Sequence, residues 1–115
     1  MTADPVERPL VGVGVVVWKD GKVLLIRRGQ APRQGQWSLP GGKQELAETV
    51  RETAMREVQE EAGIDISVGP LLDVVDAIVR NRAGGIDFHY TLVDFEADWV
   101  SGDPRPGDDA DGLVW

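Results

Sequence analysis

Three glutamates near the end of one predicted helix are the residues best suited to chemistry. Glu57 and Glu61 are four residues apart and Glu60 is three residues from Glu57, so their carboxylates can converge on one helix face. Acids near the C-terminal end of a helix oppose its dipole, at roughly 0.3–1 kcal/mol each when exposed. A divalent cation such as Mg²⁺ or Mn²⁺ would offset that cost, because these ions prefer carboxylate and carbonyl oxygens. The alternative is a solvated acidic face, which is common on helices.

A glycine turn before this helix supplies further groups to the predicted site. The turn can direct a backbone carbonyl at the ion. Arg56 can pair with one acid, and Glu48 is a plausible partner across the turn. That pairing would leave the three glutamates for a cation.

The helix that must carry these side chains is delimited by local signals. Thr49 followed by Glu52 fits a capping box, and Gly63 occupies the place of a left-handed C-terminal cap. The residues between, 50–62, contain no Gly or Pro and would form a helix of ~20 Å. Small apolar residues recur every four positions and predict the face that packs on a sheet: Val50, Ala54, Val58 and Ala62.

The spacing of residues 42–64 resembles the signature of the Nudix hydrolases at every fixed position. It is Gly, five residues, Glu, seven residues, then Arg-Glu-apolar-x-Glu-Glu-x-Gly-apolar, and residues 37–41 also resemble the segment that leads into it. The resemblance implies an α/β fold, an α/β/α sandwich with a mixed sheet. It also implies hydrolysis of a nucleoside diphosphate linked to another moiety, with water attacking one phosphorus of the pyrophosphate.

The resemblance also implies roles for the acids. Glu57, Glu60 and Glu61 would be metal ligands with the Gly41 carbonyl, while Glu57 could instead orient the attacking water as a base. Arg56 and Glu48 would hold the loop and helix together. Members of the family often add one acid from outside the signature, for which Glu96 is the candidate and Asp108 and Asp109 are rivals.

Several residues outside the helix are candidates for substrate contacts. Arg27 and Arg28 end a predicted strand, where one of them could bind a substrate phosphate or both could be solvated. Arg33 lies in a polar loop that could border the ligand pocket, although such loops are also common without that role. We expect Trp37 to pack against the core, with base stacking as the minor alternative.

The substrate class stays open between two candidates. The segment Asn81-Arg82 and the strand around residues 88–90 resemble small family members that cleave ADP-ribose or nucleotides, so ADP-ribose-like molecules and (d)NTPs are rivals. A family-like module that binds a nucleotide without cleaving it is the alternative function. An intact set of acids argues against that alternative.

The flanking sequence predicts strands joined by turns. Apolar segments predict strands at 10–18, 23–28, 71–80, 86–99 and 113–115. Turn residues predict reversals at 19–22, 69–70 and 81–85, and a Gly-, Pro- and Asp-rich loop at 101–112.

Composition bounds the remaining possibilities. The 115 residues predict one domain, 1–115, which lacks the second helix of the family and which we expect to be incomplete at its C-terminal end. Without that helix one face of the sheet would be bare, unless a second subunit in a homodimer covers it.

A net charge of −8 argues against binding to a nucleic-acid duplex. The absence of cysteine suits a reducing, cytoplasmic location, and no apolar run predicts a membrane span.

Overall fold

The computed structural model describes residues 6–29, 34–107 and 110–115. Within these residues the chain forms eight strands and one helix. In chain order they are β1 (Leu10–Lys19), β2 (Lys22–Val23), β3 (Leu25–Arg28), β4 (Trp37–Ser38), β5 (Gly41–Lys43), α1 (Val50–Ala62), β6 (Asp65–Arg80), β7 (Ile86–Ser101) and β8 (Ala110–Val114).

The larger sheet is mixed, as predicted. Its strand order is β2-β1-β7-β6, and β5 also pairs with β1. The central strands β1 and β7 run parallel, whereas every other pairing in this sheet is antiparallel. A parallel pair needs a long crossover between its strands, and here α1 and β6 are part of that crossover.

A second, three-stranded sheet has the order β4-β3-β8. The predicted single strand at 23–28 is therefore wrong, because the chain changes sheets at Leu24, between β2 and β3. Leu24 is completely buried, so this crossing point is also part of the core. The two-residue turn before β2 agrees with the prediction: Asp20 and Gly21 have φ values of 52° and 75°, and β1 pairs with β2 across them.

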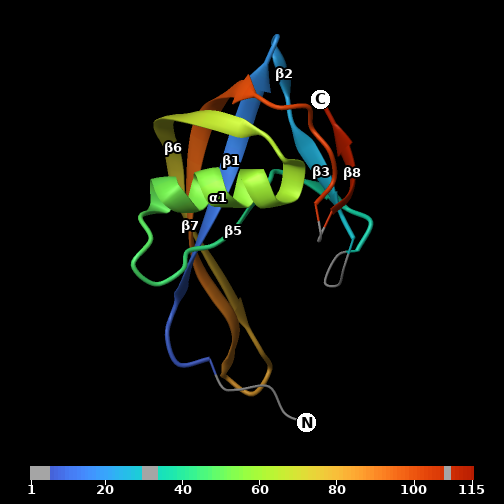
Figure 1. Cartoon of the computed structure of the whole chain (residues 1–115). Helices are drawn as coiled ribbons and strands as arrows, with labels where there is room; N and C mark the ends of the chain where they lie inside the picture. The colour runs from blue at the N-terminus through green and yellow to red at the C-terminus, as the bar shows by residue number, and fades with distance from the viewer. Residues whose placement is uncertain (1–5, 30–33, 108–109) are drawn as a thin grey trace.

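Helix α1 lies across one face of the larger sheet, in front of β1, β7 and β6 (Figure 1). Alternate residues of β1 point toward it, and Val13, Val15 and Val17 are nearly or fully buried. On the helix, Ala54, Val58 and Ala62 are completely buried, while Val50 packs at the edge of the same core. The predicted apolar face is thus confirmed, and it fixes which side of α1 remains free for the acids.

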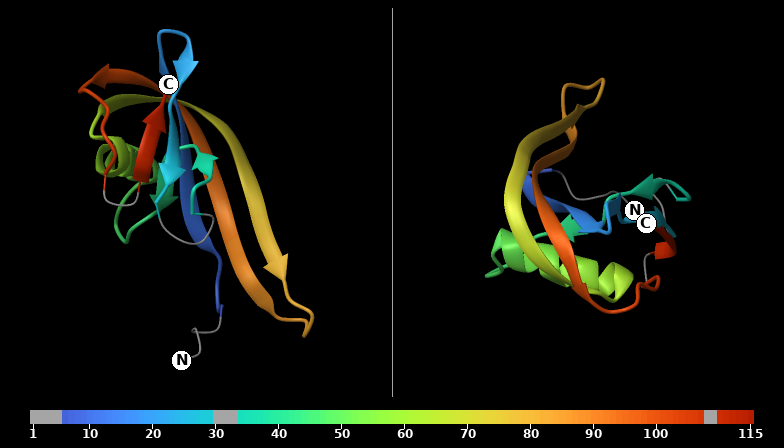
Figure 2. Two further views of the ribbon diagram at one scale, coloured as in Figure 1. Left: turned by 90° about the vertical axis from the view of Figure 1, so that its right-hand side faces the viewer. Right: turned by 90° about the horizontal axis from the view of Figure 1, so that it is seen from above.

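Strands β6 and β7 form a long hairpin that extends well beyond α1 (Figures 1 and 2). The turn predicted at Gly69-Pro70 is wrong, because β6 already begins at Asp65 and runs through both residues with a shift in register. Proline is tolerated there because β6 is an edge strand, whose outer side needs no amide hydrogen. The predicted turn at 81–85 does join the two strands.

The fold class agrees with the prediction in the mixed sheet and in the helix on one face. A second helical layer is not among the described residues, in which α1 is the single helix. No helix in this part of the chain is long and apolar enough to cross a membrane.

Candidate functional site

The two ends of α1 are fixed by the capping contacts that the sequence predicted. The amide of Glu52 donates to Thr49 Oγ1 and the amide of Thr49 donates to Glu52 Oε1, both at 3.1 Å. At the other end Gly63 is left-handed, with φ 70°, and its amide donates to the carbonyl of Gln59 at 2.9 Å. The rotation of the helix about its axis is therefore well defined, and with it the direction of each acid.

Arg56 and Glu48 form the predicted pair across the turn. Arg56 Nε donates to Glu48 Oε2 at 2.7 Å and Arg56 Nη2 donates to Glu48 Oε1 at 3.0 Å. Thr53, which is completely buried, adds a hydroxyl donor to Glu48 Oε1 at 2.7 Å. The hydrogen bonds from Arg56 and Thr53 lower the pKa of Glu48 to about 2, so this carboxylate stays ionised.

The same arginine joins the helix to β5 and to the neighbouring acids. Arg56 Nη2 also donates to the carbonyl of Lys43 at 2.9 Å, and Nη1 donates to Glu57 Oε1 at 2.8 Å. A third contact reaches Glu60 Oε2 at 3.2 Å. One guanidinium thus fixes the glycine turn, the helix and the direction of two predicted ligands.

Glu57 lies directly against the glycine turn. A Cβ added at Gly42 would be 2.4–2.5 Å from the three carboxyl atoms of Glu57, so only glycine leaves room for this side chain. Burial raises the pKa of Glu57, although Arg56 acts in the opposite direction. The carboxyl group is therefore held in a confined space beside the backbone.

Glu61 is the most strongly perturbed acid of the group. Burial is the main cause that raises its pKa to about 8, and the adjacent Glu57, which is hydrogen-bonded to it, adds to the effect. The amide of Gly41 donates to Glu61 Oε2 at 3.3 Å, and the charge of Arg28 also favours the ionised form. Two carboxyl groups that share a confined space without a cation are difficult to ionise together.

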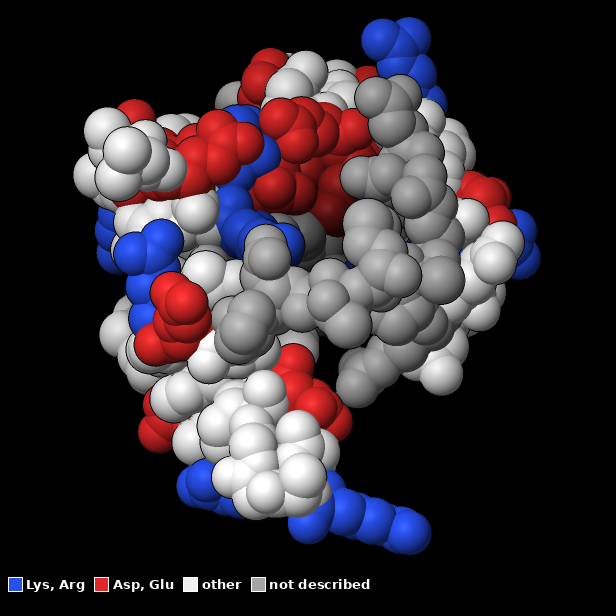
Figure 3. All heavy atoms as spheres, turned by 90° about the horizontal axis from the view of Figure 1, so that it is seen from below, with Lys and Arg blue, Asp and Glu red and all other residues white. Residues whose placement is uncertain are grey.

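These observations test whether the residues suit a divalent cation. Glu57 and Glu61 converge beside the Gly41-Gly42 backbone, where burial is the main cause that raises both pKa values, and a bound cation would favour their ionised forms. Acidic side chains also gather around a recess on the face seen in Figure 3. The donor set therefore fits a hard divalent ion.

The third glutamate does not converge with the other two. The side chain of Glu60 is 57% exposed and its carboxylate contacts Arg56. Within the described residues no three carboxylate or imidazole groups are arranged around a common point. Coordination by Glu57, Glu60, Glu61 and the Gly41 carbonyl therefore remains a prediction, and coordination by Glu60 requires its side chain to turn away from Arg56.

The two arginines of β3 point in different directions. Arg27 donates from Nε to Asp111 Oδ1 and lies with its guanidinium carbon 5.5 Å from the ring centre of Trp37. Arg28, the next residue in the strand, acts electrostatically on Glu61. Of this pair, Arg28 is the one beside the acidic site, and its contact with a phosphate stays a prediction. Arg33, Asp108 and Asp109 lie outside the described residues.

Two predicted positions require correction. Trp37 does not pack in the core, because 46% of it is exposed and it lies instead beside Arg27 on the smaller sheet. Glu96 follows buried Phe95 in β7, so it points to the sheet face opposite α1, where Trp18 Nε1 lies 3.4 Å from its carboxylate. Its position does not support a role as a ligand beside Glu57 and Glu61.

The structure adds a contact that sequence reasoning missed. The loop after β7 binds the last turn of α1: the amide of Arg105 donates to Ala62 O and the amide of Gly107 donates to Glu61 O, both at 2.9 Å. A Cβ on Gly107 would be only 1.7 Å from the carbonyl oxygen of Glu60. The C-terminal end of a helix leaves backbone carbonyls without partners inside the helix. The Gly-rich loop predicted after the last long strand was the only signal in the sequence for a segment that could bind them.

Comparison with known proteins decides the family. The model of the NUDIX domain matches residues 8–115 of the chain. The chain belongs to the Nudix family. The family assignment made from the residue spacing is thereby confirmed.

Relatives of this Nudix chain have several stated substrates. It is 39% identical over 102 residues to an ADP-ribose pyrophosphatase of Methanocaldococcus jannaschii, which covers 89% of this chain and 58% of that protein. It is 37% identical over 87 residues to the CTP pyrophosphohydrolase of Escherichia coli, covering 70% of this chain and 64% of that protein. The chain therefore spans about three fifths of the length of these relatives.

A solved structure has the same fold. The MutT NUDIX hydrolase from Burkholderia pseudomallei has a TM-score of 0.81 and 38% sequence identity, covering 95% of this chain and 83% of that one. This likeness supports the fold class that the sequence predicted for the Nudix chain.

Proposed function

We propose that this Nudix chain hydrolyses the pyrophosphate bond of a nucleoside diphosphate that is linked to another moiety. The observation that carries the proposal is the confinement of Glu57 and Glu61 beside the Gly41-Gly42 backbone, where Arg56 and Glu48 fix the turn to the helix. The names of the relatives in archaea and bacteria, an ADP-ribose pyrophosphatase and a CTP pyrophosphohydrolase, support the same class of reaction.

The metal proposed for this site is Mg²⁺ or Mn²⁺. When bound, such an ion neutralises phosphate charge, orients the substrate and lowers the pKa of water. Glu57, Glu61 and, after rotation away from Arg56, Glu60 would hold it, with the Gly41 carbonyl as a further oxygen ligand. Arg56 and Glu48 keep the turn and the helix at a fixed separation while the ion and substrate exchange.

The proposed reaction is a single displacement at phosphorus. A water oxygen forms a bond to one phosphorus, the bond from that phosphorus to the bridging oxygen breaks, and the second phosphate leaves with that oxygen. The water proton passes to a carboxylate, for which Glu57 is the candidate when it is not a ligand. Arg28, on the side of β3 near Glu61, is the candidate to contact the leaving phosphate.

Two substrate classes give different products. Cleavage of ADP-ribose yields AMP and ribose 5-phosphate, whereas cleavage of a (d)NTP at the same type of bond yields a nucleoside monophosphate and pyrophosphate. The chain should therefore be incubated with Mg²⁺ or Mn²⁺ and ADP-ribose, CTP or 8-oxo-dGTP, and the products separated by chromatography.

Matched amide variants test the roles of the acids. Glu57→Gln, Glu60→Gln and Glu61→Gln should each reduce turnover strongly, while Asp20→Asn in the exposed β1–β2 turn should have no effect. If all three glutamate variants keep full turnover, the proposed mechanism is wrong. If the unchanged chain binds the nucleotides with metal but releases no product, the alternative, a module that binds nucleotides without catalysis, is correct.

The cellular setting is also a proposal. The absence of cysteine and the nucleotide substrates favour a cytoplasmic location for the chain. A net charge of −8 disfavours nucleic-acid duplexes as partners.

A further inference from the structure

The outer half of strand β6 is an apolar sheet edge that no described residue covers. β6 ends the strand order of the larger sheet, so one side of it is unpaired. Its large apolar side chains are 40–51% exposed on both faces: Leu71, Leu72, Val74, Val75, Ile78 and Val79. Phe88 on β7 is also 41% exposed. An edge of this kind readily pairs with another strand.

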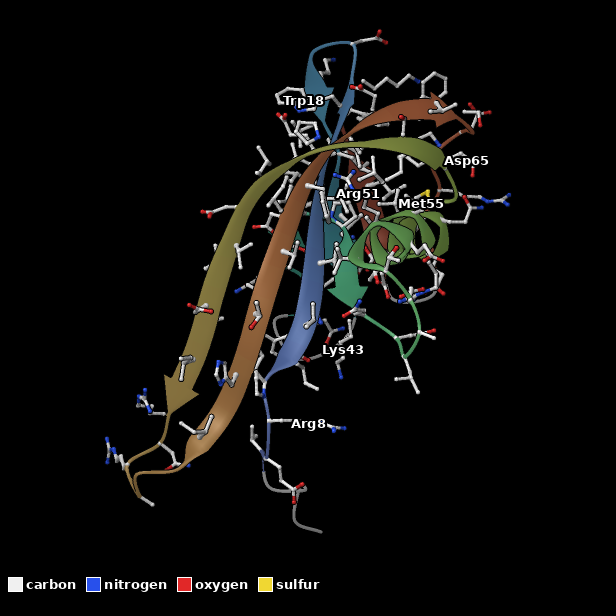
Figure 4. All side chains as sticks on the ribbon, turned by 90° about the vertical axis from the view of Figure 1, so that its left-hand side faces the viewer. Arg8, Trp18, Lys43, Arg51, Met55 and Asp65 are labelled. Atoms are coloured by element: carbon white, nitrogen blue, oxygen red, sulfur yellow. The ribbon has the colours of Figure 1, made fainter. Side chains whose placement is uncertain are left out.

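The inner part of the same edge is protected differently. Arg51 reaches from α1 toward the sheet, as Figure 4 shows, and its Nη1 donates to the carbonyl of Gly69 at 2.9 Å. Beyond Leu71 the hairpin extends away from α1 (Figures 2 and 4). Between Val74 and Val79 the single charged residue is Asp76. Arg51 therefore protects the inner part of β6 from pairing with another strand. The outer part is less protected, because Asp76 is its single charge between Val74 and Val79.

Beyond Val74, β6 carries one acidic and one basic side chain, which could pair with the opposite charges of a second copy. Asp76 and Arg80 are both exposed, and neither has an ion-pair partner within the described residues. Antiparallel pairing of two β6 strands would bring the acidic part of one beside the basic part of the other. Opposite charges at facing positions stabilise such a pair, and like charges destabilise it.

Symmetry restricts how the two strands can pair. In antiparallel strands, two residues that face each other point their side chains to the same face of the sheet. A two-fold axis perpendicular to the sheet must therefore pass between two copies of the same residue. An axis at Asp76 would place two carboxylates against each other. An axis at Ile78 would instead place each Asp76 opposite Arg80 of the second copy.

We infer that the end of the β6–β7 hairpin is a self-association surface through which two copies of this chain pair antiparallel along residues 76–80 of β6. The two-fold axis lies at Ile78, and Asp76 of each copy faces Arg80 of the other. The proposal is independent of the proposed catalytic activity, because none of these residues is near Glu57 or Glu61.

The oligomeric state gives the first test. Sedimentation equilibrium of the full chain from about 1 to 200 μM, a range suited to a small interface, should show a monomer of 12.5 kDa in equilibrium with a dimer of twice that mass. A monomer at every concentration would overturn the proposal, as would a dimer in which pairing is unaffected by the substitutions below.

Charge exchange tests the facing pair. Asp76→Arg and Arg80→Asp should each weaken the dimer by about tenfold, because each places like charges opposite one another twice. The doubly exchanged chain should regain the original dissociation constant. If the double variant is as weak as the single ones, Asp76 and Arg80 do not face each other. Circular dichroism of each variant establishes that it remains folded.

Cross-linking tests the position of the axis, because the chain contains no cysteine. In the proposed pairing two copies of Ile78→Cys have Cα atoms about 4.5–5.5 Å apart, within the range of a disulfide. Val74→Cys, in the same strand and 51% exposed, would be separated from its own copy by about eight residues, or ~26 Å. Ile78→Cys should therefore form a covalent dimer under mild oxidation and Val74→Cys should not. Equal cross-linking of both, or of neither, would overturn the proposed pairing.

Discussion

Glu48 and Arg56 meet at two points across the turn that precedes α1, with Nε–Oε2 and Nη2–Oε1 distances of 2.7 and 3.0 Å. A guanidinium and a carboxylate in this arrangement fix orientation as well as separation. Since the same guanidinium also binds the carbonyl of Lys43 and the carboxylate of Glu57, it sets the position of the acids relative to the glycine turn.

Replacement of Arg56 by lysine should therefore impair the site while retaining the charge. Lysine cannot make the paired contacts with Glu48 together with the contact to Lys43 O, so Glu57 loses its fixed position. We expect metal affinity and turnover to fall by about 10–100-fold. Titration calorimetry with Mn²⁺ measures the first and product release the second. Lys22→Ala, at the exposed start of β2, is the control, and equal losses in both variants would contradict this role of Arg56.

Addition of a single methyl group at Gly42 should displace Glu57. The new Cβ would be 2.4–2.5 Å from its carboxyl atoms, so the acid must move away from the turn. Gly42→Ala should lower the affinity for Mn²⁺ with little loss of folded protein. In Gly85→Ala, the atoms nearest to the added Cβ would be those of the Asn81 side chain, at 3.1 Å or more, so metal affinity should be unchanged. An unchanged affinity in Gly42→Ala would show that Glu57 does not bind from this position.

The pH dependence of the metal-free protein should follow Glu61. Its pKa is about 8 in the folded chain against an ordinary 4.5, so the folded state binds the proton more tightly than the unfolded state does. The stability due to this proton is complete below pH 4.5 and is lost as the pH rises through about 8. In EDTA the Tm should therefore fall between pH 4.5 and about 8.

Two comparisons test this explanation. Because a cation competes with the proton, the affinity for Mn²⁺ should rise over the same pH interval. Glu61→Gln removes the titrating group and should flatten the pH dependence of the Tm in EDTA. A dependence that persists unchanged in Glu61→Gln would assign it to another group.

Gly107 should matter because its backbone binds the last turn of α1. Its amide binds Glu61 O, and an added Cβ would be 1.7 Å from Glu60 O, so Gly107→Ala must displace the loop or the helix end. We expect a destabilisation of about 1–3 kcal/mol, measured by denaturant unfolding. Asp103→Ala, an exposed substitution in the same loop, should be close to neutral. A neutral Gly107→Ala would show that the loop does not hold this turn.

Local signals predicted the parts of the site that depend on short sequence distances. The capping box at Thr49, the left-handed Gly63 and the Arg56–Glu48 pair all involve residues within one helix or one adjoining turn. The same regular spacing placed Glu57 and Glu61 on one side of α1. These features follow from helix geometry, which needs no knowledge of the rest of the chain.

Contacts between distant segments could not be predicted in this way. Whether Arg27 or Arg28 faces Glu61 depends on how β3 leaves the larger sheet at Leu24, and the side of β7 that carries Glu96 depends on its register with β1. Trp37 does not pack in the core as predicted, because its strand lies in the smaller sheet and leaves it exposed.

By itself the sequence determined the family, the helix that carries the acids and the pairing that holds its turn, because these depend on residue types at fixed short spacings. The tertiary structure alone decided which acids converge, which arginine accompanies them and that Gly107 supports the helix end. It could do so because burial, strand register and close backbone approach arise only when segments far apart in the chain are packed together.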